Sequence, residues 1–386
     1  DAFADAPFNT KISYASKAFT CLAMCKIVAD EGLCIDTVSS GELYTALMAG
    51  IKGESVTYHG SNKSDEELRY AVGSGVGCIV IDSFYEIEQL QNICRSLNTV
   101  QNVMIRINPG IMASTHERIL TGKADSKFGI ALSDAYDAAQ QIAAHSPHLR
   151  LKGLHCHIGS QIATDKAFVA AASNLIALYE KIVLQLHIDL KEINLGGGFN
   201  IDYTEEETPF DINGYARALS ALFEEKFNAS SLPMPTVAIE PGRYIVGPAG
   251  ITLYTVGVVK DLAGLRKYIS VDGGLYENLR PALYNAKYRL TVANKHHLAK
   301  DELVTVSGRC CESDTLFEDV LLQSCAPGDT LAVLHTGAYH FAMASNYNRL
   351  PRPAVVLLKG DKSEIIIRRE TKEDMIRNDK LPCWLD

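Results

Sequence analysis

Between residue 11 and about residue 243, the chain repeats one pattern eight times: a short apolar run, a polar turn and a helical stretch. Eight strand–helix units without an internal sequence repeat predict an α/β fold, a (β/α)8 TIM-like barrel. A doubly wound open sheet is the alternative, but it normally carries an early glycine-rich nucleotide turn, which is missing here. The eight expected strands span residues 12–15, 33–38, 55–59, 77–82, 102–107, 151–158, 192–195 and 236–240.

Helical stretches separate these strands, over residues 21–30, 41–49, 64–73, 84–97, 132–145, 165–186 and 212–228. After Pro248 the pattern changes to β-like runs spaced by turns, which indicates a separate domain. We therefore expect a barrel over residues 1–247 and a mostly-β C-terminal domain over residues 248–386. The strands of the second domain are expected over residues 251–260, 267–271, 286–292, 303–307, 330–334, 354–359 and 362–368, and its closing helix over residues 370–379.

The composition argues against several classes of partner. The net charge is −9 and no basic run exceeds Arg368-Arg369, so neither nucleic acid nor an anionic membrane is expected as the main partner. We see no apolar stretch long enough to span a bilayer. The ten cysteines are scattered without metal-like pairing, which favours reduced thiols and a cytoplasmic location.

Lys17 directly follows the first expected strand. In a barrel of parallel strands, the chemistry takes place at the carboxyl ends of the strands. A lysine that is enclosed and partly desolvated there can lose its proton and form a Schiff base with an aldehyde cofactor. Taken alone, Lys17 is better interpreted as a surface lysine, so its role depends on what lies at the other strand ends.

Polar motifs do gather at those other strand ends. Because the carboxyl ends of parallel strands meet at one rim of a barrel, these motifs are expected to form one site. They are His59-Gly60-Ser61-Asn62-Lys63, Asp82-Ser83, His155-Cys156-His157-Ile158-Gly159-Ser160-Gln161, Gly196-Gly197-Gly198 and Glu240-Pro241-Gly242-Arg243.

Gly196, Gly197 and Gly198 follow the seventh strand. Their backbone N–H groups are free of side-chain hindrance, which suits an anionic phosphate. The loops after strands seven and eight are also where barrels commonly hold phosphate. A tight turn with close backbone packing explains the triplet equally well when it is considered alone.

His155 and His157 alternate along the sixth strand, so their rings should face opposite sides. They are poorly placed to share one metal ion, and we expect no metal site. One of them is expected to be a structural histidine. The other can face the barrel mouth and stack on a planar cofactor.

Glu240 ends the last barrel strand, and a buried carboxylate needs a partner. One candidate is Arg243. The other is the protonated ring nitrogen of a cofactor, where the carboxylate would keep a pyridine protonated and so strengthen it as an electron sink. Both interpretations remain open at this point.

The second domain adds three candidate residues, Arg280, Cys311 and Tyr339. Each has a structural alternative. Arg280 could form a surface ion pair, Cys311 could be a small buried apolar residue, and Tyr339 could serve packing alone. As isolated motifs, they favour these structural interpretations.

The motifs occur in an order that resembles a known family. In sequence they are Lys17, the run over residues 155–161, the glycine triplet, Glu240-Pro241-Gly242-Arg243, Arg280-Pro281-Ala282-Leu283-Tyr284, Cys311-Glu312-Ser313 and Gly337-Ala338-Tyr339. The set is similar to that of the fold type III pyridoxal-phosphate decarboxylases, and among them to those that act on diaminopimelate. The resemblance runs from residue 11 nearly to the end of the chain.

This resemblance implies pyridoxal 5′-phosphate as the cofactor. Lys17 would hold it covalently, His157 would stack on its ring and Glu240 would pair with the ring nitrogen. Its phosphate would be bound or bordered by Ser160, Gly196, Gly197, Gly198, Gly242, Arg243 and Tyr339. The distal end of the substrate would be held by Arg243, Arg280, Tyr284, Glu312 and Tyr339. Cys311 would return a proton after carbon dioxide has left.

The same resemblance implies a homodimer with shared sites, in which Cys311 and Glu312 reach into the active site of the partner subunit. Arginines offer a planar fork to the distal carboxylate of the substrate, and Glu312 can accept from its ammonium group. Relatives that act on basic amino acids usually carry Asp after the cysteine, so Glu312 favours diaminopimelate. The implied reaction is decarboxylation of meso-2,6-diaminopimelate to L-lysine, the last step of lysine biosynthesis.

Several alternatives stay open. The enzyme could decarboxylate another basic amino acid or a carboxylated polyamine. A racemase of this fold would typically place an arginine, rather than Glu240, near the ring nitrogen. A catalytically inactive regulatory relative is disfavoured by the intact Lys17, His157, Glu240 and Cys311. A metal-dependent barrel hydrolase would need convergent histidine and carboxylate ligands.

The sequence departs from the family pattern at three places. Phe19 stands where asparagine is usual, and the glycine that usually follows the Cys-Glu-Ser motif is missing before Asp314. The second change could reshape the loop that carries Cys311. Family members also usually have a segment before the position of Asp1 that supplies a strand to the β domain, and we expect this segment to be missing from the numbering used here.

Overall fold

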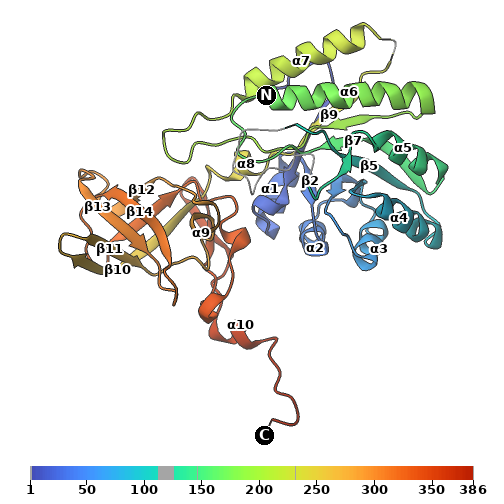
Figure 1. Ribbon diagram of the computed structural model, residues 1–386. Coiled ribbons are helices and arrows are strands. Elements are labelled where there is room, and N and C mark those ends of the chain that lie inside the picture. Colours follow the sequence, from blue (N-terminus) through green and yellow to red (C-terminus); the bar gives the residue numbers. More distant parts are fainter. Residues whose placement is uncertain (1, 112–125, 146, 231, 386) are drawn as a thin grey trace. The chain divides into compact units, whose positions relative to one another are not determined.

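Eight parallel strands close a ring in the N-terminal part of the chain (Figure 1). The structure, a computed structural model, describes residues 2–111, 126–145, 147–230 and 232–385. Its contacts divide the chain into two units, of which the first comprises residues 1–202 and 207–245 and the second residues 203–206 and 246–386. Sequence analysis places the domain boundary after residue 247, close to this division.

The ring follows the order of the chain. β9 returns to pair with β1, and the pairing of β4 with β5 closes the barrel, so the predicted TIM-like barrel is confirmed. A short additional strand, β6 (Ile130–Ala131), pairs with β5 and was not predicted, because two residues carry no readable pattern. The barrel strands are β1 (Thr10–Ala15), β2 (Cys34–Thr37), β3 (Val56–Tyr58), β4 (Cys78–Ile81), β5 (Gln101–Asn108), β7 (Leu149–Cys156), β8 (Glu192–Asn194) and β9 (Thr236–Ile239).

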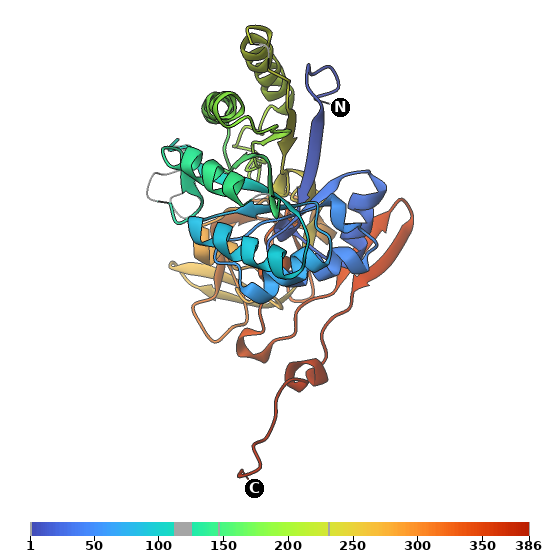
Figure 2. The same cartoon turned by 90° about the vertical axis from the view of Figure 1, so that its right-hand side faces the viewer.

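Helices follow the strands and lie outside them (Figure 2). Serine caps start three of them close to the strand ends: the hydroxyls of Ser39, Ser64 and Ser83 each accept an N–H bond from the third residue of α2, α3 or α4. Such caps satisfy backbone donors that a helix start leaves open. The helices are α1 (Leu22–Asp30), α2 (Ser40–Met48), α3 (Asp65–Gly73), α4 (Phe84–Ser96), α5 (Ala135–Ala144), α6 (Lys166–Leu186) and α7 (Ile212–Asn228).

α6 corrects one expectation from the sequence, since its 21 residues are long and apolar enough to cross a membrane by length and composition. Its run of alanine and leucine explains this hydropathy. One face of the helix is buried, including Phe168, Leu175 and Tyr179, and it contacts α7 and β7. This is the packing of an outer helix in a barrel, where an apolar face covers the strands.

The second unit is built mainly of antiparallel strands. One sheet has the order β12-β15-β10-β11-β13-β14, and β16 and β17 form a separate hairpin. Two elements in it were not predicted: β14, whose apolar run is interrupted by Glu318-Asp319, and the five-residue helix α9 (Arg280–Tyr284). The others are β10 (Ile251–Leu262), β11 (Arg266–Val271), β12 (Leu290–Val292), β13 (Glu302–Ser307), β14 (Thr315–Leu322), β15 (Thr330–Leu334), β16 (Val355–Lys359), β17 (Lys362–Ile367) and α10 (Lys372–Ile376).

Candidate active site

Lys17 lies in a tight turn directly after β1, the single-turn 3-10 helix η1 (Ser16–Ala18). The buried Tyr14 donates its hydroxyl to the carbonyl of Phe19 at 2.8 Å, which ties the two sides of this turn together. The prediction that Lys17 sits at the carboxyl end of the first strand is confirmed. Its side chain is exposed rather than enclosed, so the desolvation that we expected is not present in this structure.

The glycine triplet forms a narrow backbone cradle after β8. A Cβ added to Gly197 would lie 2.1 Å from the carbonyl oxygen of Glu240, and one added to Gly198 would lie 2.1 Å from that of Gly159. Gly196 and Gly198 also have φ values of +67° and +110°, which favour glycine. The cradle is therefore a place where only bare backbone fits, as an anion such as phosphate requires.

Gly242 brings the end of the last strand against the turn that carries Lys17. A Cβ at Gly242 would lie 2.9 Å from the carbonyl oxygen of Ala15 and 3.1 Å from Cβ of Ala18. In addition, the N–H of Ala15 donates to the carbonyl of Pro241 at 3.2 Å. The closure of the barrel thus places the residues around Lys17 and those around Glu240 at one rim.

Arg243 begins α8 (Arg243–Val246) and is buried. Its Nη2 donates to Oγ of Ser160 at 3.1 Å. The interpretation of Arg243 as the ion-pair partner of Glu240 was therefore wrong, because the carboxylate of Glu240 contacts other residues. Instead, Arg243 connects the loop after β7 to the helix after β9, next to the glycine cradle.

His157 is half-buried beside the cradle, and its Nδ1 accepts the N–H of Gly197 at 3.3 Å. Burial lowers the pKa of His157 well below its ordinary value, and the positive charges of Lys17 and Arg106 lower it further. The ring is therefore neutral near pH 7. A neutral, planar imidazole fixed by the cradle is suited to stack on an aromatic cofactor ring.

Glu240 is 5% exposed and follows the last barrel strand. Asn194 Nδ2 donates to Oε1 at 2.7 Å, and His155 Nε2 lies 3.2 Å from Oε2. Nε2 of His59 lies 3.0 Å from Oε1. Although burial opposes ionisation, His59 and His155 hold the pKa of Glu240 well below its ordinary value. The site therefore contains a fixed, buried carboxylate anion.

Two charged residues that sequence analysis did not single out face the same interior. Asp36, on β2, is buried with Oδ1 3.6 Å from Nε2 of His59, and burial raises the pKa of Asp36 to about 6. Nε of Arg106, on β5, lies 3.9 Å from Oδ1 of Asp82. A charged residue within a short buried strand was the available signal for Asp36, because such residues are seldom placed there without a partner.

His59, His155 and Glu240 also offer three ligand atoms within 4.8 Å of one another. The sequence argument against a metal considered only His155 with His157, so it did not weigh this group. The 3.2 Å contact of His155 with the carboxylate is a hydrogen bond, whereas Nε2 of His59 lies 3.0 Å from Oε1 without making one. Both imidazoles thus lie against the carboxylate, and the expectation of no metal remains a prediction.

In the second unit, Arg280 is held by aromatic residues rather than by a surface ion pair. It begins α9, is buried, and donates to the hydroxyl of Tyr288. Its guanidinium lies 4.6 Å from the ring centre of Tyr203 and 5.4 Å from that of Tyr288. Neither tyrosine was predicted, because no spacing in the sequence links them to Arg280.

Two other predicted residues of this unit, Tyr284 and Tyr339, are half-buried. Tyr284 is the last residue of α9. Tyr339 has a φ of +58°, a left-handed backbone conformation that is uncommon for a side chain of this size. Their proposed contacts with a substrate and a phosphate remain predictions.

Cys311 and Glu312 lie in an exposed loop of the second unit. The N–H of Cys311 donates to Asn348 at 2.8 Å, and the hydroxyl of Tyr347 donates to Glu312 at 2.7 Å. Asp314 orders the base of the loop, because its carboxylate accepts the N–H groups of Cys310 and Leu275, both at 2.7 Å. Asp314 itself takes a φ of +39°, so it occupies the left-handed position where the missing glycine would be favoured.

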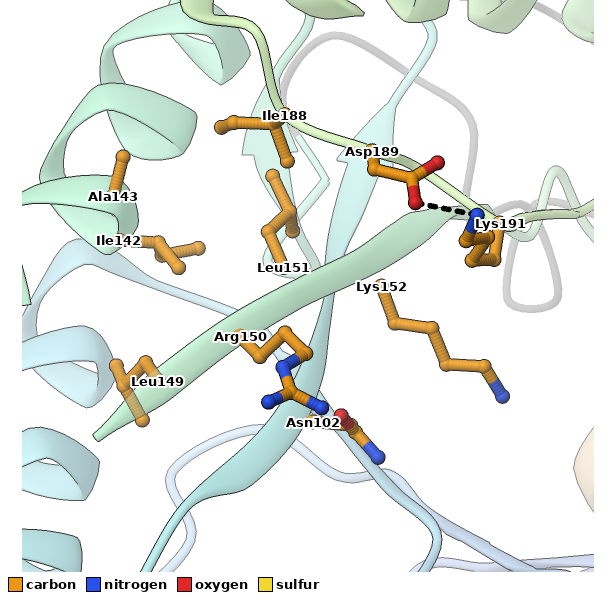
Figure 3. A pocket seen from close by; sticks show the side chains of 10 residues that line it. All are labelled: Asn102, Ile142, Ala143, Leu149, Arg150, Leu151, Lys152, Ile188, Asp189 and Lys191. Carbon is orange, nitrogen blue, oxygen red and sulfur yellow. Dashed lines mark ion pairs between the residues drawn. The ribbon is translucent and has the colours of Figure 1, made fainter. Parts of the chain in front are cut away.

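A cavity of about 630 Å³ lies at the opposite end of the barrel (Figure 3). It is lined by the first residues of β7 and by the segment that leads into β8, where Lys191 pairs with Asp189 at 2.5 Å. None of the predicted site residues lines it. The chemistry-bearing side chains are at the carboxyl ends of the strands, whereas this cavity is at their amino ends.

The fold and the site together define a barrel enzyme whose rim carries a glycine cradle, a neutral histidine and a buried carboxylate, an arrangement that suits a phosphorylated, planar cofactor. Residues 1–247 match the family described as "Pyridoxal-dependent decarboxylase, pyridoxal binding domain", and the chain belongs to this family. The cradle, which has no space for a Cβ, and the ionised Glu240 both fit pyridoxal phosphate.

Individual relatives agree with this family. The diaminopimelate decarboxylase of Bacillus subtilis (strain 168) is 44% identical over 380 residues, which cover 98% of this chain and 87% of that protein. That of Staphylococcus aureus (strain COL) is 44% identical over 385 residues, covering 98% of this chain and 89% of that protein. A crystal structure of the Helicobacter pylori diaminopimelate decarboxylase complexed with L-lysine has a TM-score of 0.90 at 32% identity, covering 98% of this chain and 91% of that chain.

Proposed function

We propose that this chain catalyses the pyridoxal-phosphate-dependent decarboxylation of meso-2,6-diaminopimelate to L-lysine, the last step of lysine biosynthesis. The observation that carries the chemistry is the buried carboxylate of Glu240, which is held ionised at the same barrel rim as Lys17 and the glycine cradle. The choice of substrate is supported by the diaminopimelate decarboxylases that are 44% identical over nearly the whole chain.

When bound, pyridoxal phosphate withdraws electrons from the α-carbon of the substrate, which allows its carboxylate to leave as carbon dioxide. In this proposal, the Lys17 amine holds the cofactor covalently. The Glu240 carboxylate accepts the ring N–H and so favours the protonated ring. The neutral His157 covers one ring face, and Ser160 and the glycine cradle border the phosphate.

The residues of the second unit would handle the substrate and the returning proton. Arg280 keeps its charge and is oriented by Tyr203 and Tyr288, so it can bind the distal carboxylate of diaminopimelate. Glu312 would accept from the distal ammonium group. The Cys311 thiol would donate a proton to the α-carbon after the loss of carbon dioxide. Arg243 and Tyr284 complete the proposed substrate contacts.

We also propose that the protein acts as a homodimer in the cytoplasm. Cys311 and Glu312 are exposed on their own chain, as residues that complete the site of a partner subunit would be. The ten free cysteines suit a reducing compartment.

The purified chain tests the proposal directly. Carbon dioxide release should be fastest with meso-diaminopimelate and much slower with lysine, ornithine or arginine, because these lack the second, distal carboxylate that Arg280 would bind. A preference for one of the basic amino acids would overturn the choice of substrate. Lys17→Ala should abolish the visible absorption band of the bound cofactor together with turnover. A parent protein that is colourless with added pyridoxal phosphate would indicate the regulatory alternative.

A further inference from the structure

Glu240 is surrounded by donors from three different strand ends, and two of them have no role in the reaction so far. These are His59, which follows β3, and His155 on β7. Their rings lie 4.9 Å apart, edge to face, and are 4% and 1% exposed. The third donor, Asn194 on β8, is fully buried.

His155 can act only as a neutral donor. Its Nε2 lies 3.2 Å from Oε2 of Glu240, whereas its Nδ1 is buried and has no hydrogen-bond partner among the described residues. The contact with a carboxylate assigns the hydrogen to Nε2. Burial lowers the pKa of His155 to about 4, against the raising effect of Glu240, so the ring stays neutral while it donates.

His59 lies between two buried carboxylates. Its Nε2 is 3.0 Å from Oε1 of Glu240 and 3.6 Å from Oδ1 of Asp36. Nε2 makes no hydrogen bond to either carboxylate in this structure. An acceptor nitrogen at this position would face two anions, so the geometry places a hydrogen on Nε2. The other charged side chains that act on this group include Arg106 from β5, Lys17 from η1 and Glu42 from α2.

We propose that His59 and His155 are positioning residues, which hold Glu240 as an oriented anion so that it keeps the cofactor ring nitrogen protonated, with Asp36 orienting His59. The proposal rests on the proposed function, because it concerns the same cofactor. Its physical basis is that a buried carboxylate is stable only while donors solvate it. The imidazole of His155 and the amide of Asn194 donate to the carboxylate here, and the imidazole of His59 lies 3.0 Å from it.

The consequence of losing one donor follows directly. Without His59, Oε1 of Glu240 retains only Asn194, and the acid can take up a proton or rotate. A protonated Glu240 would donate to the ring nitrogen instead of accepting from it. The bound ring would then be neutral and a weaker electron sink. The effect on binding should be roughly ten- to hundredfold, as for other hydrogen bonds to charged groups.

The experiment compares binding of two cofactors by the full chain, measured by absorbance or fluorescence titration. One is pyridoxal phosphate, and the other is its 1-deaza analogue, in which carbon replaces the ring nitrogen. His59→Leu should weaken the binding of pyridoxal phosphate roughly ten- to hundredfold and leave the binding of the analogue unchanged. His59→Gln, whose amide can reproduce the Nε2 donor, should restore binding. Turnover of His59→Leu should show a lower kcat with a nearly unchanged KM.

Two further variants keep the test decisive. The asparagine of His59→Asn is polar and smaller, so this variant should fold even if the leucine variant does not. Its amide is too short to reach Glu240, so its affinity for pyridoxal phosphate should fall likewise. His148→Leu is the matched control, because His148 contacts the carbonyl of Thr99 at the other end of the barrel. It should leave both cofactors unaffected.

Three results would overturn the inference. They are an unchanged affinity in His59→Leu and His59→Asn, an equal loss for both cofactors, and a stoichiometric metal in the parent that disappears with His59. The equal loss would mean a merely structural role. If the parent bound neither cofactor, the proposed function would fail and the inference with it, so the two failures are distinguishable.

Discussion

Glu277, in the second unit, is a buried acid with polar groups next to both of its carboxyl oxygens. Its Oε1 accepts the hydroxyl of Tyr254 at 2.8 Å and the N–H of Gly274 at 3.0 Å, and its Oε2 lies 3.2 Å from Nε2 of His340. Burial raises the pKa of Glu277 to about 7 and lowers the pKa of His340 to about 3. The imidazole next to Oε2 is therefore neutral, and Glu277 is protonated below about pH 7.

This pair predicts a pH-dependent effect of Glu277→Gln. The folded state holds the proton up to about pH 7, whereas the unfolded state releases it near its ordinary pKa of 4.5. The stabilisation by Glu277 is thus fully present below pH 4.5 and is lost as the pH rises through about 7. Glutamine keeps the donor and never ionises. The variant should match the parent at pH 4.5 and exceed it at pH 8 by about 2 to 3 kcal/mol in unfolding free energy.

Urea unfolding at the two pH values measures this difference. Glu364→Gln serves as the control, because Glu364 is exposed on β17 and its replacement should give the same small difference at both pH values. An effect of Glu277→Gln that did not change between pH 4.5 and pH 8 would contradict the assignment of the proton.

At the residue scale, sequence analysis could place Lys17, the glycine triplet and Glu240, because each directly follows an apolar run that reads as a strand. It could not find Asn194 or the tyrosines around Arg280. Asn194 is an ordinary polar residue within a strand, and only the closed barrel brings its amide to 2.7 Å from Glu240. Such partners depend on which strands become neighbours, and a linear sequence does not contain this information.

At the scale of elements, a buried ion pair connects the loop after β3 to the first turn of α4. Lys63 Nζ lies 2.5 Å from Oε1 of Glu86, and the two side chains are 2% and 3% exposed. Lys63 also donates to the carbonyls of Gly60 and Val80 at 2.7 and 2.8 Å. One lysine thus joins a loop, a strand and a helix that together border the barrel rim.

Lys63→Met should therefore lower the free energy of unfolding by about 3 to 5 kcal/mol, because it leaves the carboxylate of Glu86 buried without its cation. The double variant Lys63→Met, Glu86→Leu should recover part of this loss, since no uncompensated charge remains. Recovery should be incomplete, because the carbonyls of Gly60 and Val80 lose the donor that Lys63 provided. Chemical unfolding of the parent, both single variants and the double variant measures the coupling between Lys63 and Glu86. Strictly additive losses of unfolding free energy would contradict this coupling.

Element prediction succeeded where the apolar pattern was continuous. All eight barrel strands were found because each is a short apolar run, and the seven outer helices because each follows a polar turn. β14 was missed because Glu318-Asp319 breaks its pattern, and in the structure Asp319 takes a φ of +51° and the register with β13 shifts nearby. A strand with such an irregularity is held by its neighbour more than by its own alternation.

At the scale of the whole molecule, the proposed homodimer predicts that two inactive variants complement each other, which a monomeric enzyme could not do. Lys17→Ala and Cys311→Ala should each be nearly inactive alone. When the two are co-expressed, a mixed dimer would contain one site with both native residues, if Cys311 serves the site of its partner. Random pairing of subunits then restores about one quarter of the parent activity.

The measurement is carbon dioxide release by the co-expressed protein, together with light scattering that gives the mass of the assembly. Co-expression of two copies of the same variant is the control and should restore nothing. If co-expression also restored nothing while the mixed dimer was demonstrably present, each site would be built by one chain, and the shared arrangement would be wrong.

The pairing of β9 with β1 has a further consequence for biosynthesis of the chain. Asp36 and His59 belong to the early part of the barrel, whereas Glu240 follows its last strand, and the three lie against one another in the closed barrel. If the proposed function is correct, a nascent chain lacks a complete cofactor site until β9 has been synthesised and has paired with β1. Bound pyridoxal phosphate would then stabilise only the completed subunit.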